Sequence, residues 1–241
     1  MTDTGERERF VTALLDSWPW ELGGCLVGGY AVAAYGKPRY SRDADFVIPE
    51  AAREPITNWV IARGLMTRAA RGTDGNPIFD DARNFESKEA SIDMMFGRVR
   101  DRETRVSIPE REISTNSRKV RLELITGSTE TPITVCRPEA LWALKLVAAR
   151  DQDLSDLFAI SEEPTEFGQV WEILERHQTP QLVSRLKQVP IRLQSRKIFL
   201  DALSARSMRT QGQAASLKQW ERFVRIVEPL RRPETFPFTV S

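Results

Sequence analysis

The sequence predicts an α/β (α+β) fold, with a mixed sheet backed by helices in the N-terminal half and helices alone in the C-terminal half. Short strand-like runs alternate with helical patterns up to about residue 137. Beyond residue 138 the apolar residues recur only at helical spacing. Because a mixed segment followed by a helical one indicates two separately packed parts, we place two domains at residues 1–137 and 138–241.

The N-terminal elements are predicted from periodicity and from the residues that end each run. Residues 6–18 have helical spacing, and a buried strand over 25–27 ends at a glycine pair. A small, alanine-rich segment over 30–35 predicts a short helix packed close to the sheet. A strand over 45–48 then leads to a helix that opens at Pro49 and reaches about residue 63.

Four further strands and a set of C-terminal helices complete the prediction. The strands are expected over 78–79, 91–96, 120–125 and 133–136, the first two of them paired. Pro138 opens a helix that we expect to run continuously to about residue 157. Helical periodicity then recurs around 171–174, 182–186, 198–203 and 220–227.

Composition excludes several classes of protein. Of the 241 residues, 41% are hydrophobic and 29% charged, as in globular proteins, and the net charge of +1 implies no overall attraction to nucleic acid or membrane. No apolar run approaches the roughly 20 residues of a membrane-spanning helix, and the N-terminus lacks a secretory signal pattern. We therefore expect a cytoplasmic protein without a membrane partner. Cys25 and Cys136 lie in apolar runs and are expected to be buried free thiols.

Asp43 and Asp45 begin the strand-like run that ends at residue 48. Because side chains on a strand alternate with period two, two acids at i and i+2 share one face of the sheet. Mg²⁺ takes oxygen ligands and often only one or two protein carboxylates, so this pair suits an ion that carries phosphates. The alternative is a solvated loop at the entry to the strand, where aspartates are common.

Two further features strengthen the first interpretation. Gly28 and Gly29 stand between a strand and a helix, where backbone N–H groups are able to face an anion, although a tight turn without a ligand would use them too. Asp93 interrupts an otherwise apolar strand, and burying a carboxylate there is costly unless it is paired or binds a metal. Asp93 is therefore a candidate third metal ligand or general base, with a structural ion pair as the alternative.

These residues resemble a known family. Leu26-Val27-Gly28-Gly29 followed by Arg39-Tyr40-Ser41-Arg42-Asp43-Ala44-Asp45 is similar to the signature of the DNA polymerase β-like nucleotidyltransferase superfamily. Within it, the chain most resembles the AbiEii-like branch, which includes the MenT toxins of bacterial type IV toxin–antitoxin systems. The segment 138–157 resembles a helix of that branch, although Gln152 stands where the family has a basic residue, which leaves the role of Arg150 open.

The resemblance implies a reaction and a set of site residues. It implies transfer of a nucleoside monophosphate from an NTP to an RNA acceptor, with the 3′ end of tRNA expected, and an antitoxin partner. It implies Mg²⁺ or Mn²⁺ on Asp43, Asp45 and Asp93, and a phosphate contact by Ser41. The helical domain would complete the nucleotide and acceptor cleft.

Lys145 and Asp156 fall on one stripe of the helix expected over 138–157. A lysine between Leu144 and Leu146 suits a cleft where it would contact a phosphate, or else extends past the edge of the core to water. Asp156 would orient a neighbouring or substrate group, or form a surface ion pair. Arg39, beside the acids, is a candidate phosphate contact, although charged loop tips are usually solvated.

Two alternatives stay open at this stage. The same site would serve a small-molecule acceptor, as in aminoglycoside nucleotidyltransferases, or an inactive module that only binds NTP. Basic side chains in the C-terminal half are either ordinary helix surface or a seat for an RNA backbone. They are Arg185, Lys187, Arg192, Arg196, Lys197, Arg206 and Arg209.

Overall fold

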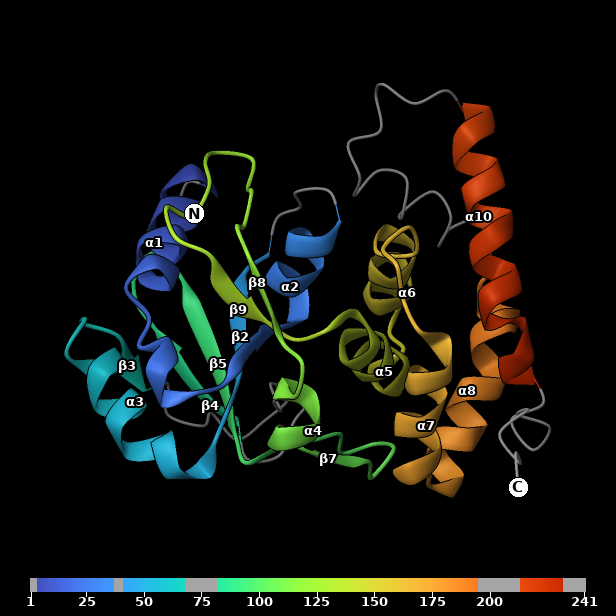
Figure 1. Cartoon of the computed structure of the whole chain (residues 1–241), viewed down its shortest axis with the longest axis horizontal. Helices are drawn as coiled ribbons and strands as arrows, with labels where there is room; N and C mark the ends of the chain where they lie inside the picture. Colours follow the sequence, from blue (N-terminus) through green and yellow to red (C-terminus); the bar gives the residue numbers. More distant parts are fainter. Residues whose placement is uncertain (1–3, 37–40, 68–81, 195–212, 232–241) are drawn as a thin grey trace. The chain divides into compact units, whose positions relative to one another are not determined.

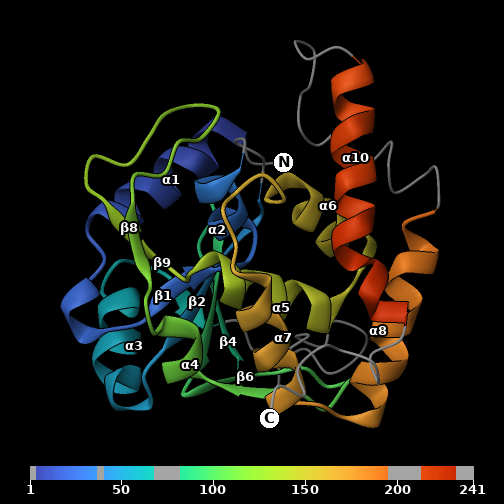
Figure 2. The same ribbon diagram turned by 45° about the vertical axis from the view of Figure 1, so that its right-hand side comes forward.

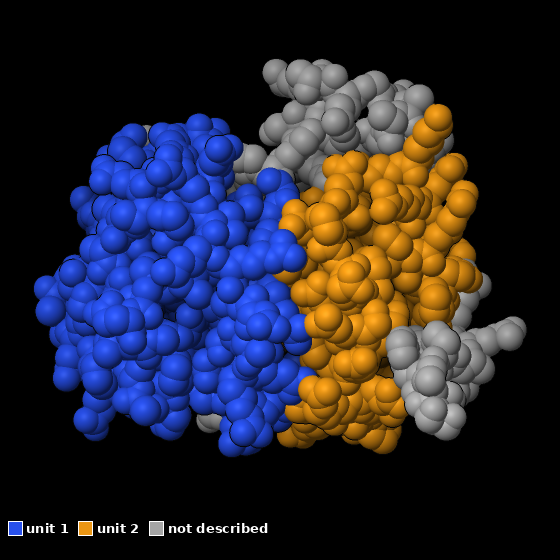
Figure 3. All heavy atoms as spheres, in the orientation of Figure 1, with its two compact units in different colours: residues 1–102, 107–137 blue, residues 103–106, 138–241 orange. Residues whose placement is uncertain are grey.

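A computed structural model describes residues 4–36, 41–67, 82–194 and 213–231 (Figures 1 and 2). Its chain separates into two compact units (Figure 3). Unit 1 comprises Met1–Arg102 and Ser107–Arg137, and unit 2 comprises Glu103–Val106 and Pro138–Ser241. The four residues 103–106 therefore group with the helices of unit 2, although they lie within the N-terminal half of the sequence.

Unit 1 is built on a mixed sheet, which confirms the predicted fold class. Within the described residues seven strands follow the order β3-β4-β5-β2-β1-β9-β8. Strand β2 pairs in parallel with β5 and antiparallel with β1, and β1 pairs in parallel with β9. The strands are β1 (Cys25–Val27), β2 (Asp43–Ile48), β3 (Met66–Thr67), β4 (Ala82–Glu86), β5 (Ser91–Phe96), β8 (Arg118–Val120) and β9 (Ile133–Val135). A separate antiparallel pair joins β6 (Arg98–Arg100) to β7 (Ser107–Pro109).

One face of the sheet is covered by aromatic side chains. Trp18 stacks on Phe46 of β2 with ring centroids 3.8 Å apart, and Trp59 packs edge-on against Trp18 at 5.3 Å. These rings bring α1 (Thr4–Asp16) and α3 (Arg53–Ile61) to one side of the sheet, while α2 (Gly28–Tyr35) and α4 (Glu110–Ser114) lie on the other (Figure 1). Because residues alternate along a strand, Asp43 and Asp45 face away from this aromatic cluster.

Both cysteines are free and buried, as predicted. Burial raises the pKa of the Cys25 thiol to about 12, although a hydrogen bond with the Ser117 side chain opposes the shift. Cys25 therefore stays protonated at neutral pH and acts as a small apolar core residue.

The described residues of unit 2 form helices joined by short connections, with no strand among them. Its core contains a chain of aromatic contacts in which Phe223 packs against Trp142, Phe158 and Trp220 at centroid distances of 5.6–6.0 Å. The helices are α5 (Pro138–Ala148), α6 (Asp151–Ala159), α7 (Phe167–Arg176), α8 (Pro180–Arg192) and α10 (Gln213–Val227), with a short 3₁₀ turn at Glu228–Arg231. Among the described residues, no helix combines the length and apolar character needed to cross a membrane.

The structure corrects two predicted elements. The helix expected over 138–157 is two helices, because Ala149 adopts a positive φ of 42° between α5 and α6. The strand expected over 120–125 is β8, which ends at Val120, and the following residues form a loop with one isolated bridge between Glu123 and Ser128. The strand expected over 78–79 and the helix over 198–203 fall outside the described residues.

Candidate functional site

Asp43 and Asp45 both lie within β2 and not in the loop that enters it. Both side chains are half-buried, whereas Ala44 and Phe46, which alternate with them, are fully buried. The burial pattern therefore places the two carboxylates on the same face of the sheet, as the period-two spacing predicts.

Asp93 is the register partner of Asp45 across the parallel pair of β2 and β5. Neighbouring strands lie about 4.8 Å apart, and residues in register project from the same face of a sheet. Asp43, Asp45 and Asp93 therefore occupy adjacent positions on one face, although Asp93 lies on a separate strand much further along the chain. The strand register, and not the local sequence, brings the third acid to the pair.

Two side chains that the sequence reasoning did not select contact these acids. The Ser91 hydroxyl donates a hydrogen bond to Oδ1 of Asp43, its register partner on β2. Asn84 on β4 donates from Nδ2 to Oδ1 of Asp93 at 2.5 Å. Ser91 could have been selected from the sequence, because it stands two residues before Asp93 on the same face of the predicted strand. Asn84 could not have been selected, because β4 was absent from the predicted elements.

Gly28 lies directly against the Asp45 carboxylate. A Cβ atom at position 28 would fall 1.9 Å from Oδ2 of Asp45, and the residue has a positive φ of 64°. Glycine is required here for two reasons, since a side chain would be strained by the backbone and would displace the carboxylate. Gly29 follows in the first turn of α2 and is buried.

Ser41 precedes β2 and is half-buried. Its hydroxyl donates to the backbone carbonyl of Asp43 at 3.2 Å, and its own carbonyl accepts from the Tyr30 hydroxyl at 3.4 Å. These bonds attach the loop before β2 to α2 and to the start of the strand. Arg39, the other predicted phosphate contact of this loop, lies outside the described residues.

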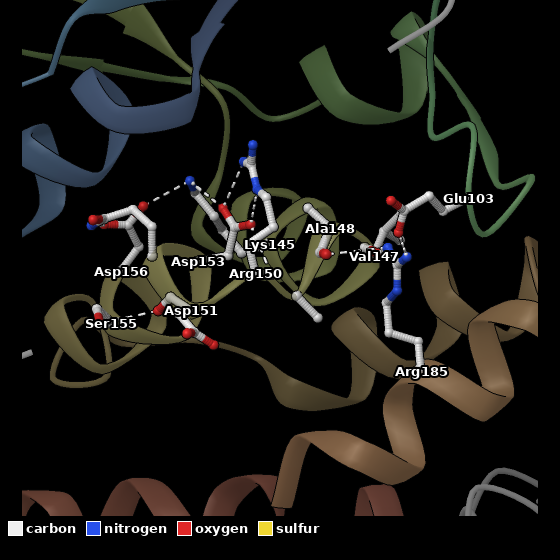
Figure 4. Close-up of polar contacts among 12 residues, drawn as sticks. Glu103, Lys145, Val147, Ala148, Arg150, Asp151, Asp153, Ser155, Asp156 and Arg185 are labelled. Carbon is white, nitrogen blue, oxygen red and sulfur yellow. Dashed lines mark hydrogen bonds and ion pairs between the residues drawn. The ribbon is translucent and has the colours of Figure 1, made fainter. Parts of the chain in front are cut away.

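Lys145 of unit 2 is buried in an ion-pair network (Figure 4). Its Nζ lies 2.8 Å from Oδ2 of Asp156 and 3.0 Å from Oδ1 of Asp153. Lys145 and Asp156, which the sequence places on one stripe of a continuous helix, lie instead on two helices and form a direct buried pair. Neither the surface pair considered for Asp156 nor an exposed ammonium for Lys145 matches this arrangement.

Arg150 completes the network at the break between α5 and α6. Its Nε lies 2.6 Å from Oδ2 of Asp153, and the same oxygen accepts the Arg150 backbone N–H at 3.1 Å. Burial raises the pKa of the Asp153 carboxyl, but the Lys145 ammonium and the Arg150 guanidinium outweigh it, so the pKa lies below its ordinary value of 3.8. Asp153, which sequence reasoning did not select, therefore stays ionised at neutral pH.

The comparison with protein families decides the family of the chain. Residues 25–237 match the family described as "Nucleotidyl transferase AbiEii toxin, Type IV TA system". The chain belongs to the AbiEii nucleotidyltransferase family. As a member it is a nucleotidyltransferase of a type IV toxin–antitoxin system, which confirms the predicted enzyme class. No match was found among curated proteins.

Solved structures give weaker likenesses to this AbiEii-family chain. JHP933 from Helicobacter pylori matches at 14% identity and a TM-score of 0.44, covering 96% of this chain and 94% of that one. A candidate nucleotidyltransferase from Thermotoga maritima, TM1012, also gives 14% identity and 0.44, covering 68% and 97%. The antibiotic-resistance factor ANT(2'')-Ia gives 14% and 0.38, covering 92% and 99%. Because all three TM-scores lie below 0.5, the family assignment rests on the sequence match alone.

Nucleotidyltransferases such as the AbiEii family generally use an NTP and a divalent metal. The acids of unit 1 carry the type of side chain that binds such an ion. Their carboxylate oxygens are the hard donors that Mg²⁺ takes, and Gly28 leaves the space that the Asp45 carboxylate occupies. Over the described ranges, no group of three His, Cys, Asp or Glu side chains is placed to hold an ion. Because Mg²⁺ needs only one or two protein carboxylates, Asp43, Asp45 and Asp93 remain the predicted ligands, and Asp93 is also a candidate base.

Two arginines of the AbiEii-family chain that were considered for RNA binding cap the end of α5. Arg185 donates from Nη1 to the carbonyls of Val147 and Ala148 at 2.8 and 3.1 Å, and it pairs with Glu103 (Figure 4). Arg192 donates to the carbonyl of Ala149 and pairs with Asp151. Because the last carbonyls of a helix have no partner within it, these guanidinium groups stabilise the break between α5 and α6.

We therefore expect Arg185→Ala to destabilise unit 2. Hydrogen bonds from a charged donor contribute about 1.5–3 kcal/mol, and the Arg185 side chain is only 19% exposed, so a loss of about 2 kcal/mol is expected. Urea unfolding measures it, with Arg222→Ala on the exposed face of α10 as the control that should change little. An unchanged unfolding free energy combined with weaker RNA binding would return Arg185 to the RNA interpretation.

Proposed function

We propose that this AbiEii-family enzyme transfers a nucleoside monophosphate from an NTP to an RNA acceptor, the 3′ end of a tRNA, with Mg²⁺ or Mn²⁺ as cofactor. The observation that carries the proposal is the register of β2 and β5, which sets Asp43, Asp45 and Asp93 side by side next to Gly28. Phosphoryl-type transfer depends mostly on positioning the reactants and on neutralising their charge. The acids on this face would serve both purposes by holding a divalent ion.

In the proposed reaction, the terminal hydroxyl oxygen of the acceptor attacks the α-phosphorus of the NTP. A new P–O bond forms as the bond to the β-phosphate breaks, and pyrophosphate leaves. Asp43, Asp45 and Asp93 would hold the divalent ion, which neutralises charge on the triphosphate oxygens when bound. Asp93 would also accept the proton of the attacking hydroxyl.

The remaining predicted contacts belong to the same proposal. Backbone N–H groups at Gly28 and Gly29 begin α2, where an anion is favoured by the helix dipole, and Ser41 would donate to a phosphate in place of the Asp43 carbonyl. Lys145, Asp156 and Arg39 remain predicted contacts of the nucleotide or the acceptor. As a toxin of this family, the protein would act in the cytoplasm on RNA and be inhibited by its antitoxin.

Transfer of label from each of the four α-³²P-NTPs to total RNA, with Mg²⁺ or Mn²⁺, tests the proposal. We expect label on RNA of tRNA size with the wild type and not with Asp45→Ala. Label on an aminoglycoside and not on RNA would replace the acceptor class. Absence of label under all conditions, with nucleotide binding detected by calorimetry, would support an inactive binding module instead.

A further inference from the structure

The β4–β5 hairpin brings a neutral hydrogen-bond donor to each of two acids. Asn84 is the register partner of Asp93 across β4 and β5 and donates to it at 2.5 Å. Ser91 is the register partner of Asp43 across β5 and β2 and donates to it from its hydroxyl. Strand register therefore fixes both contacts, since each donor stands directly beside the acid that it binds.

The orientation of the Asn84 amide follows from the chemistry of its partner. An ionised carboxylate only accepts hydrogen bonds, so the amide must present its NH₂ group to Asp93. In that orientation the amide oxygen of Asn84 is buried and has no hydrogen-bond partner among the described residues. A buried unbonded acceptor lowers stability, so a purely structural site would favour an apolar residue here.

The donors also differ from cations in their effect on the acids. A lysine or arginine would orient a carboxylate equally well but would cancel its charge and repel a divalent ion. Lys145 and Arg150 do cancel charge on Asp153 of unit 2. An amide and a hydroxyl hold Asp93 and Asp43 by one oxygen each and contribute no positive charge.

We infer that Asn84 and Ser91 are positioning residues, which orient the carboxylates of Asp93 and Asp43 for a divalent cation without neutralising them. This inference rests on the proposed function, because it assigns the supporting residues of that same site. Residues that hydrogen-bond to metal ligands generally change metal affinity by about 10–100-fold when they are removed.

Titration of the whole protein with Mn²⁺, followed by the EPR signal of the free ion, tests the inference without requiring turnover. The Mn²⁺ binding that Asp45→Ala removes belongs to the candidate site. Asn84→Leu and Ser91→Ala should each weaken that binding by about 10-fold. Ser91→Thr keeps the hydroxyl on a strand-compatible side chain and should restore most of it. Thr67→Val removes a hydroxyl from exposed strand β3 of the same sheet and should leave the affinity unchanged.

The outcomes separate the inference from the function on which it rests. Wild-type affinity in Ser91→Ala, or equal losses in Ser91→Ala and Ser91→Thr, would overturn the positioning role even if label transfer to RNA is observed. The positioning role would also be overturned if Asp45→Ala removed none of the Mn²⁺ binding of the wild type. Melting temperatures identify any variant that fails to fold, and if Asn84→Leu does, the Ser91 pair decides. Label transfer itself is scored separately and decides the proposed function.

Discussion

Gly28→Ala is expected to reduce nucleotidyl transfer by about 100-fold or more, because the new Cβ would occupy space that the Asp45 carboxylate now fills. That Cβ would lie 1.9 Å from Oδ2 and 2.5 Å from Cγ of Asp45, so the carboxylate must move. Misplacing a reacting group by about 1 Å is enough for a loss of this size. The measurement is the initial rate of label transfer to RNA at saturating NTP.

Gly64→Ala provides a matched control in the same unit. Gly64 also has a positive φ, of 81°, but a Cβ there would meet nothing within 4 Å. Both substitutions should therefore cost about 1–2 kcal/mol of backbone strain, whereas only Gly28→Ala should lose activity. If the two variants were equally active, the Asp45 carboxylate would not be the place where the chemistry occurs.

Local patterns in the sequence were sufficient to select the three acids that the strand register brings together. The Asp-x-Asp pair, the glycine pair and the acid within an apolar strand each have a short-range signature, and the structure places Asp43, Asp45 and Asp93 side by side in register. The α/β character of the N-terminal half and the helical C-terminal half were also predictable, because apolar periodicity changes from about two to about 3.6 along the chain.

The parts that were missed depend on distant residues. Strand β4 contains only one large apolar residue, Phe85, so its partner β5 and not its own pattern makes it a strand, and Asn84 was overlooked with it. The break between α5 and α6 has no glycine or proline to signal it. The carbonyls at this break accept hydrogen bonds from Arg185 and Arg192 of α8, a helix that lies well beyond the break in the sequence.

Lys145→Met is expected to destabilise the protein by about 3–5 kcal/mol at neutral pH, since removing one member of a buried ion-pair network leaves uncompensated charge. Lys145 is 7% exposed and contacts both Asp153 and Asp156, whose side chains are 1% exposed. Asp153 retains the Arg150 guanidinium, whereas the Gln152 amide that donates to Asp156 at 3.2 Å carries no charge. Urea unfolding of the variant and the wild type measures the loss.

The double variant Lys145→Met/Asp156→Asn is the matched control. Neutralising Asp156 removes one of the two charges that Lys145 compensates, so the double variant should recover part of the stability lost in Lys145→Met. Additive losses would show instead that the lysine acts through packing of its aliphatic stem and not through charge.

The pH dependence of that loss follows from the sign of the Asp153 shift. Because its pKa is lowered in the folded state, Asp153 contributes stability above its unfolded pKa of 3.8, and this contribution is lost as the pH falls through the folded value. Without Lys145 the carboxyl titrates at higher pH in the folded state. The difference in unfolding free energy between wild type and Lys145→Met should therefore shrink as the pH falls from neutral to below 3.8. A constant difference over that range would mean that charge does not determine the effect of the substitution.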